Sequence, residues 1–113
     1  ARPAWVTKPP VAFLGFKAHS APSGFEYFKG FKDPALQNSI LVCLHGSTSV
    51  WRQRGNSIVK VEKGNRYTEI ITGFLTGKTE AGRHGRPCDI LMKNENSFFF
   101  TDDLNGILYY LWK

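Results

Sequence analysis

The side chains that could carry chemistry in this chain of 113 residues are three histidines, two cysteines and one pair of adjacent aspartates. They are His19, His45 and His84, Cys43 and Cys88, and Asp102 with Asp103. A histidine acts as a general base only within hydrogen-bond reach of the proton that it takes, so the histidines form a catalytic site only if they converge. Otherwise each is a channel-lining or loop residue.

The cysteines and histidines include metal-ligand types, but they lack the short paired spacing of a zinc site, so we predict no metal site. Neither Cys43 nor Cys88 belongs to a CxxC pair. We therefore expect two buried, reduced thiols, with a disulfide or a shared metal as alternatives. Asp102 and Asp103 lie in a predicted turn, where they either bind a cation, act as acid and base, or satisfy local backbone groups.

The balance of basic and acidic residues limits the classes of partner that the chain could bind. Fifteen Lys and Arg against nine Asp and Glu give a formal charge of +6, which would permit nucleic-acid binding. The basic residues are scattered and form no block, so we predict a soluble basic surface and no nucleic-acid partner.

No apolar run approaches the length of a membrane span, so no membrane association is predicted. Trp51 with Arg52 and Arg54 is either a sugar-stacking platform or a loop anchor.

The elements that must position these residues are predicted to be β-strands. Aromatic residues make up 14% of the chain, which suits pleated, half-buried surfaces, and eleven Gly with six Pro argue against long helices. The continuous apolar run Ile40–His45 is typical of a strand buried on both faces. We predict an all-β fold with strands at Val11–Phe16, Phe25–Phe28, Ile40–His45, Ser57–Glu62, Tyr67–Thr72, Cys88–Lys93, Ser97–Thr101 and Ile107–Trp112.

The stretch Gly85–Trp112 holds the last three of these strands, and Asn105-Gly106 suits the positive backbone dihedrals of a hairpin turn. With no fourth strand beside it, Ile107–Trp112 would be an open, hydrophobic edge. Such an edge promotes aggregation unless something pairs with it. The sequence therefore predicts that a further strand completes this sheet.

Counting strands predicts one domain over residues 1–113 that is a two-blade unit of a β-propeller, in which four-stranded sheets repeat around an axis. Its parts are an extended lead-in at 1–10, a strand at 11–16, a full blade at 25–72 and an incomplete blade at 86–113. The strand at 11–16 is predicted to complete the incomplete blade of a neighbouring copy.

Several motifs together resemble one known family. They are HSAPSG at His19–Gly24, ILVCLHGS at Ile40–Ser47, GRPCDI at Gly85–Ile90 and TDD-x-NG-x-x-Y at Thr101–Tyr109. In their order and spacing over residues 10–113 they are similar to the soluble glucose and sorbosone dehydrogenases, which are quinoproteins on a six-bladed β-propeller. The chain would match the last third of a full-length member.

The resemblance implies pyrroloquinoline quinone and calcium as cofactors. It implies cofactor binding by His19 or Ser20, by His45, and by Arg86 as the first of two arginines that clamp carboxylates. Cys88 stands where the second arginine would be. The family's catalytic base and calcium ligands lie mostly on earlier blades, so no catalytic residue is predicted here.

The resemblance implies a sugar oxidoreductase that is active when oligomerised, in the periplasm or secreted. Two alternatives remain, a propeller that binds a sugar or another small ligand without catalysis, and a structural or interaction ring. Two blades alone leave both lateral faces bare, so we predict a homo-oligomer, a ring of three chains with six blades. The alternative is that the chain is a piece of a larger propeller.

Overall fold

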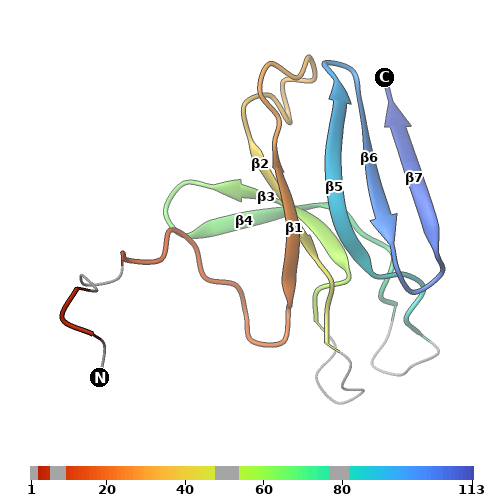
Figure 1. Ribbon diagram of the computed structural model, residues 1–113. Coiled ribbons are helices and arrows are strands. Elements are labelled where there is room, and N and C mark those ends of the chain that lie inside the picture. The colour runs from red at the N-terminus through yellow and green to blue at the C-terminus, as the bar shows by residue number, and fades with distance from the viewer. Residues whose placement is uncertain (1–2, 6–9, 48–53, 77–81) are drawn as a thin grey trace.

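The computed structural model describes residues 3–5, 10–47, 54–76 and 82–113. Within these ranges the protein is all-β, with two antiparallel sheets and no α-helix (Figure 1). The four-stranded sheet has the order β1-β2-β3-β4 and the three-stranded sheet the order β5-β6-β7. The strands are β1 (Pro22–Tyr27), β2 (Ile40–Leu44), β3 (Ser57–Glu62), β4 (Arg66–Ile71), β5 (Pro87–Asn94), β6 (Ser97–Asp102) and β7 (Ile107–Trp112).

The predicted all-β class is confirmed, and seven of the predicted strands are present. The bounds predicted for β3 and β7 match, whereas β1 begins earlier, at Pro22. β2 is buried on both faces along most of its length, as its continuous apolar run indicates. In the turn between β6 and β7, only Gly106 takes a positive φ, of 67°, so the turn is longer than the two-residue hairpin expected at Asn105-Gly106.

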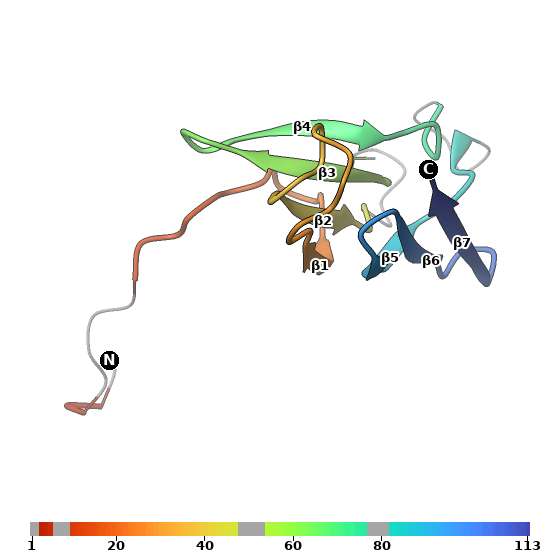
Figure 2. The same ribbon diagram turned by 90° about the horizontal axis from the view of Figure 1, so that it is seen from above.

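The segment Val11–Phe16 is the exception, because it forms no strand in the single chain. The Gly15 N–H donates to Asn65 Oδ1 at 3.0 Å, and the Phe16 ring packs on Tyr67 with centroids 5.1 Å apart. These contacts hold the segment on the side of the four-stranded sheet that faces away from β7 (Figure 2). It cannot pair with β7 of its own chain there, and its pairing with another copy stays a prediction.

The main core lies between the two sheets, where phenylalanines from both meet edge to face. The Phe28 ring is 5.1 Å from the Phe31 ring and 5.1 Å from the Phe98 ring. Phe98 is buried because alternate side chains of β5 and β6 point toward the four-stranded sheet, and Phe28 and Phe31 follow β1 on the facing side. The core comprises Phe28, Phe31, Leu41, Cys43, Ile58, Ile90, Phe98 and Phe100.

The first strands of the two sheets, β1 and β5, lie side by side (Figure 1). Their backbones approach so closely at Gly24 that a Cβ there would lie 2.7 Å from the Cα of Asp89. Ser23 Oγ donates to the Cys88 carbonyl at 2.6 Å, and the Met92 N–H donates to Glu26 Oε2 at 3.1 Å. Side chains of β1 thus form hydrogen bonds with backbone groups of β5, whereas the two backbones are not paired as neighbouring strands of one sheet.

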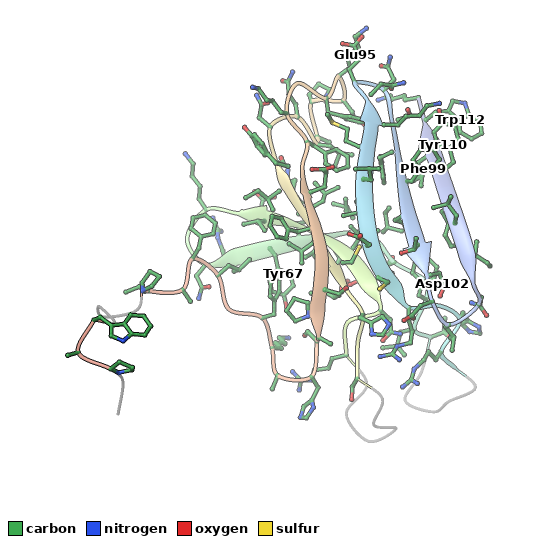
Figure 3. All side chains as sticks on the ribbon, viewed as in Figure 1. Tyr67, Glu95, Phe99, Asp102, Tyr110 and Trp112 are labelled. Carbon is green, nitrogen blue, oxygen red and sulfur yellow. The ribbon has the colours of Figure 1, made fainter. Side chains whose placement is uncertain are left out.

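At the other side of the three-stranded sheet, β7 pairs with β6 and, among the described residues, with no further strand. Figure 3 shows Tyr110 and Trp112 together on this outermost strand. The predicted open and apolar edge is therefore confirmed for the single chain. No helix in the described ranges is long and apolar enough to cross a membrane.

Candidate functional site

The candidate site lies where β2 ends, β5 begins and β6 ends, at one end of the sheet junction (Figure 1). The loop before β1 is fastened there, because the N–H groups of His45 and Gly46 donate to the carbonyls of Ala21 and Ser20, each at 2.9 Å. The Asp103 N–H donates to the Arg86 carbonyl at 3.3 Å. Backbone hydrogen bonds therefore fix three separate segments around one point.

Three side chains of different chemistry converge at this point. His45 Nε2 lies 2.7 Å from Asp103 Oδ1, with the His45 side chain 20% exposed and that of Asp103 51% exposed. The ligand atoms of His45, Asp103 and Cys88 all lie within 4.8 Å of one another. We call these three residues the His-Cys-Asp trio.

Arg86 lies beside the trio, and its guanidinium donates hydrogen bonds to backbone carbonyls. Its Nε donates to the His45 carbonyl at 3.2 Å and its Nη2 to the Gly46 carbonyl at 2.9 Å. The Nε and Nη2 donors form the edge of a guanidinium that pairs with a carboxylate in bidentate fashion. In this chain that edge holds the turn after β2 in place.

The other predicted site residues take different positions. Ser20 is buried and lines a hollow together with Leu44 and Tyr67. His19 precedes it with a positive φ of 69° and is not part of the trio. His84 Nε2 lies 2.9 Å from Thr76 Oγ1 in another loop. Of the three histidines, only His45 joins the trio.

Both cysteines are free, as predicted, and no disulfide joins them. Burial, reinforced by Asp89 and Cys88, raises the pKa of the Cys43 thiol to about 12. Burial and the charges of Asp103 and Asp89 also raise the pKa of Cys88, and Arg86 opposes them. The expectation of two buried thiols is wrong for Cys88, which is only partly buried and belongs to the trio.

The two adjacent aspartates have separate roles. Asp102 is buried and accepts hydrogen bonds from the Arg86 N–H at 2.9 Å, the Leu104 N–H at 3.0 Å and Asn105 Nδ2 at 2.8 Å. Burial tends to raise the pKa of Asp102, but these hydrogen bonds outweigh it and the pKa is lowered. Asp102 thus satisfies local backbone groups, the alternative named for turn aspartates, whereas Asp103 turns outward to His45.

Sequence reasoning missed the pairing of His45 with Asp103. The two residues are 58 positions apart, and the only signal was that each lies at or just after the end of a predicted strand, Ile40–His45 and Ser97–Thr101. Two strands that run in the same direction end at the same end of the molecule, but sequence does not tell which strands of two sheets adjoin or how they are oriented. Trp51 and Arg52, weighed as a sugar platform, lie outside the described residues.

The geometry bears on the implied quinone cofactor, a planar tricarboxylate. Arg86 uses its bidentate edge for backbone carbonyls, Cys88 offers no positive charge, and Asp103 adds a carboxylate beside His45. This arrangement does not favour binding of a tricarboxylate at this end of the sheet junction.

Comparison of the chain with protein-family models, with curated proteins and with solved structures found no match. Cofactor binding by His19, Ser20, His45 and Arg86 therefore stays a prediction.

Proposed function

We propose that the chain is a two-sheet unit of a β-propeller that binds a small carbohydrate at the end where His45, Asp103 and Arg86 meet. The observation that carries this proposal is the exposed His45–Asp103 pair, with its 2.7 Å separation. A half-exposed carboxylate accepts hydrogen bonds from sugar hydroxyls, and the second imidazole nitrogen donates or accepts as its tautomer dictates. Arg86 has further N–H donors on Nη1 and Nη2 beyond the two that it uses.

The proposal includes assembly into a ring, which the surface of the three-stranded sheet supports. Leu91, Leu108 and Trp112 point away from the core and are 60%, 61% and 73% exposed. A sheet that is apolar on both faces requires a neighbour on each, as in radially stacked repeats. Three chains would supply six sheets, and Val11–Phe16 of one chain would add a strand to β7 of the next. Cyclic symmetry would then cover every bare face.

A second candidate is sugar oxidation, which the same His–Asp pair favours. A carboxylate that holds one imidazole nitrogen orients the ring so that the other nitrogen can accept a proton from a hydroxyl group. The hydride would need an acceptor that is external to these residues. Reduction of a dye with a sugar panel, with added pyrroloquinoline quinone and calcium, separates this candidate from simple binding.

The test of the proposed function is carbohydrate binding to the intact chain, measured by titration calorimetry over a panel of monosaccharides. Asp103→Asn is expected to weaken binding by tenfold or more, because a hydrogen bond to a charged group contributes about 1.5–3 kcal/mol. Glu95→Gln is the matched control, since Glu95 lies at the opposite end of the sheet junction (Figure 3). Absence of binding to every sugar, or equal loss in both variants, would contradict the proposal and favour a purely structural ring.

A further inference from the structure

The His-Cys-Asp trio combines one imidazole nitrogen, one sulfur and one carboxylate oxygen from three segments far apart in the sequence. We propose that it is a binding site for a thiophilic divalent cation such as Zn²⁺. This inference rests on the geometry of the trio and does not depend on carbohydrate binding.

The choice of cation follows from the donor set. Zn²⁺ binds nitrogen, sulfur and oxygen ligands in tetrahedral sites, with bonds of about 2.0–2.3 Å. Ca²⁺ takes six to eight oxygen ligands, and the trio supplies one residue with oxygen donors. The calcium implied by the resemblance is therefore the wrong ion for this trio.

The positions of the ligand atoms require movements of about 1 Å to hold a metal: Cys88 Sγ, within 4.8 Å of the other two, would need to lie about 3.5 Å from each. In a tetrahedral site with bonds of roughly 2.0 Å, two ligand atoms lie about 3.3 Å apart. His45 Nε2 and Asp103 Oδ1, now 2.7 Å apart with a shared proton, would separate by roughly 0.6 Å as the metal replaces that proton. The half-exposed Asp103 side chain can make this movement while the His45 and Cys88 backbones stay fixed by Ala21 and Ser23.

The fourth position would be open, because the trio is partly exposed to solvent. Three protein ligands with a water in the fourth position are the arrangement of open, catalytic-type zinc sites, in contrast to the four protein ligands of structural sites. The metal would bind the Cys88 thiolate, the Asp103 carboxylate and Nε2 of neutral His45. The thiol proton and the proton on His45 Nε2 would pass to the solvent, and Nδ1 would carry the one proton that neutral His45 keeps. Two negative ligands offset the charge of the cation, while Arg86 opposes it and Asp89 favours it.

The same ligands are the groups that we propose for carbohydrate binding. A metal held by His45 and Asp103 would take away the acceptor and the imidazole nitrogen that face a sugar. Zn²⁺ is therefore expected to weaken carbohydrate binding, and metal binding is expected to persist even if no carbohydrate binds.

The experiment is titration of the reduced chain with Co²⁺, a spectroscopic substitute for Zn²⁺, followed by displacement with Zn²⁺. We expect one Co²⁺ per chain, with a thiolate-to-cobalt charge-transfer band that Zn²⁺ abolishes. Cys88→Ala should lose this band, and Asp103→Asn should weaken Co²⁺ binding by tenfold or more. Cys43→Ala is the matched control and should keep the band, because Cys43 is buried in the core and is not a member of the trio.

Circular dichroism of each variant checks that it is folded. If Cys88→Ala does not fold, the loss of Co²⁺ affinity in Asp103→Asn still tests the site. A chain without a thiolate band would overturn the proposal. A band that survives in Cys88→Ala, or one that disappears in Cys43→Ala, would also overturn it, because the metal would then lie elsewhere.

Discussion

The two faces of the three-stranded sheet have nearly the same composition and opposite environments. On the inner face, Ile90, Phe98 and Phe100 are 3–4% exposed and pack against the four-stranded sheet. On the outer face, Leu91, the next residue along β5, and Leu108 of β7 are 60% and 61% exposed. An apolar face that meets nothing costs free energy in water, so the comparison indicates that the outer face is built for a partner.

The largest expected contrast is between one substitution on each face. Phe98→Ala should lower the free energy of unfolding by about 3–5 kcal/mol, because it opens a cavity beside Phe28 and Phe31. Leu108→Lys places a charge on the bare face and should leave the chain folded while it prevents assembly. Urea denaturation and light scattering measure the two effects. Equal destabilisation by both substitutions would break the comparison.

The contact between the two sheets is tested at Gly24. Gly24→Ala places a Cβ against the backbone of Asp89, which no side-chain movement relieves, so a loss of about 1–3 kcal/mol in the free energy of unfolding is expected. Gly15→Ala is the control, since nothing lies within 4 Å of its added Cβ and its effect should stay within about 0.5 kcal/mol. Thermal or urea unfolding of both variants measures this difference. Equal losses in the free energy of unfolding would mean that β1 and β5 are not in contact.

The end of the sheet junction is tested at Asp102. Asp102→Asn should cost about 1–3 kcal/mol at neutral pH, because at least one buried donor loses its acceptor. The folded-state pKa of Asp102 lies below the usual 3.8, so its stabilisation is complete above about pH 4 and is lost as the pH falls through the folded-state pKa. The stability difference between the two proteins, measured by urea unfolding, should therefore shrink below that pH. A constant difference from pH 7 to pH 2 would contradict this role.

The smallest effect is expected from the ion pair that links the sheets at the opposite end. Lys32 Nζ lies 2.8 Å from Glu95 Oε1, and both side chains are more than half exposed. Glu95→Gln should therefore change the free energy of unfolding by no more than about 0.5 kcal/mol. A loss above 1 kcal/mol in urea unfolding would show that this end contributes more than its exposure suggests.

Much of the fold could be predicted from the sequence because its signals are local. Alternation and turn residues gave β3 and β7 with their observed bounds, and the continuous apolar run gave β2. Val11–Phe16 has the same apolar composition, but in the part of the chain that the structure describes it pairs with no strand. A strand needs a partner, and composition does not supply one.

The candidate site could be predicted only in part, because it depends on contacts between the sheets. The resemblance implied that His45 and Arg86 bind one cofactor together with His19 or Ser20, and Arg86 Nε donates to the His45 carbonyl. The commitment of Arg86 to backbone carbonyls and the pairing of His45 with Asp103 depend on how two sheets adjoin. Ser20 lies in the loop that is fastened to this end, where its carbonyl accepts a hydrogen bond from the Gly46 N–H, but it is not part of the trio.

The central claim is that the outer face and the β7 edge are completed by other copies of the chain. Light scattering coupled to size exclusion of the intact chain tests it most directly. The account predicts a single species with three times the 12.8 kDa mass of one chain, and a loss of that species when residues 1–16 are deleted. A monodisperse, folded species of 12.8 kDa for the intact chain would contradict it.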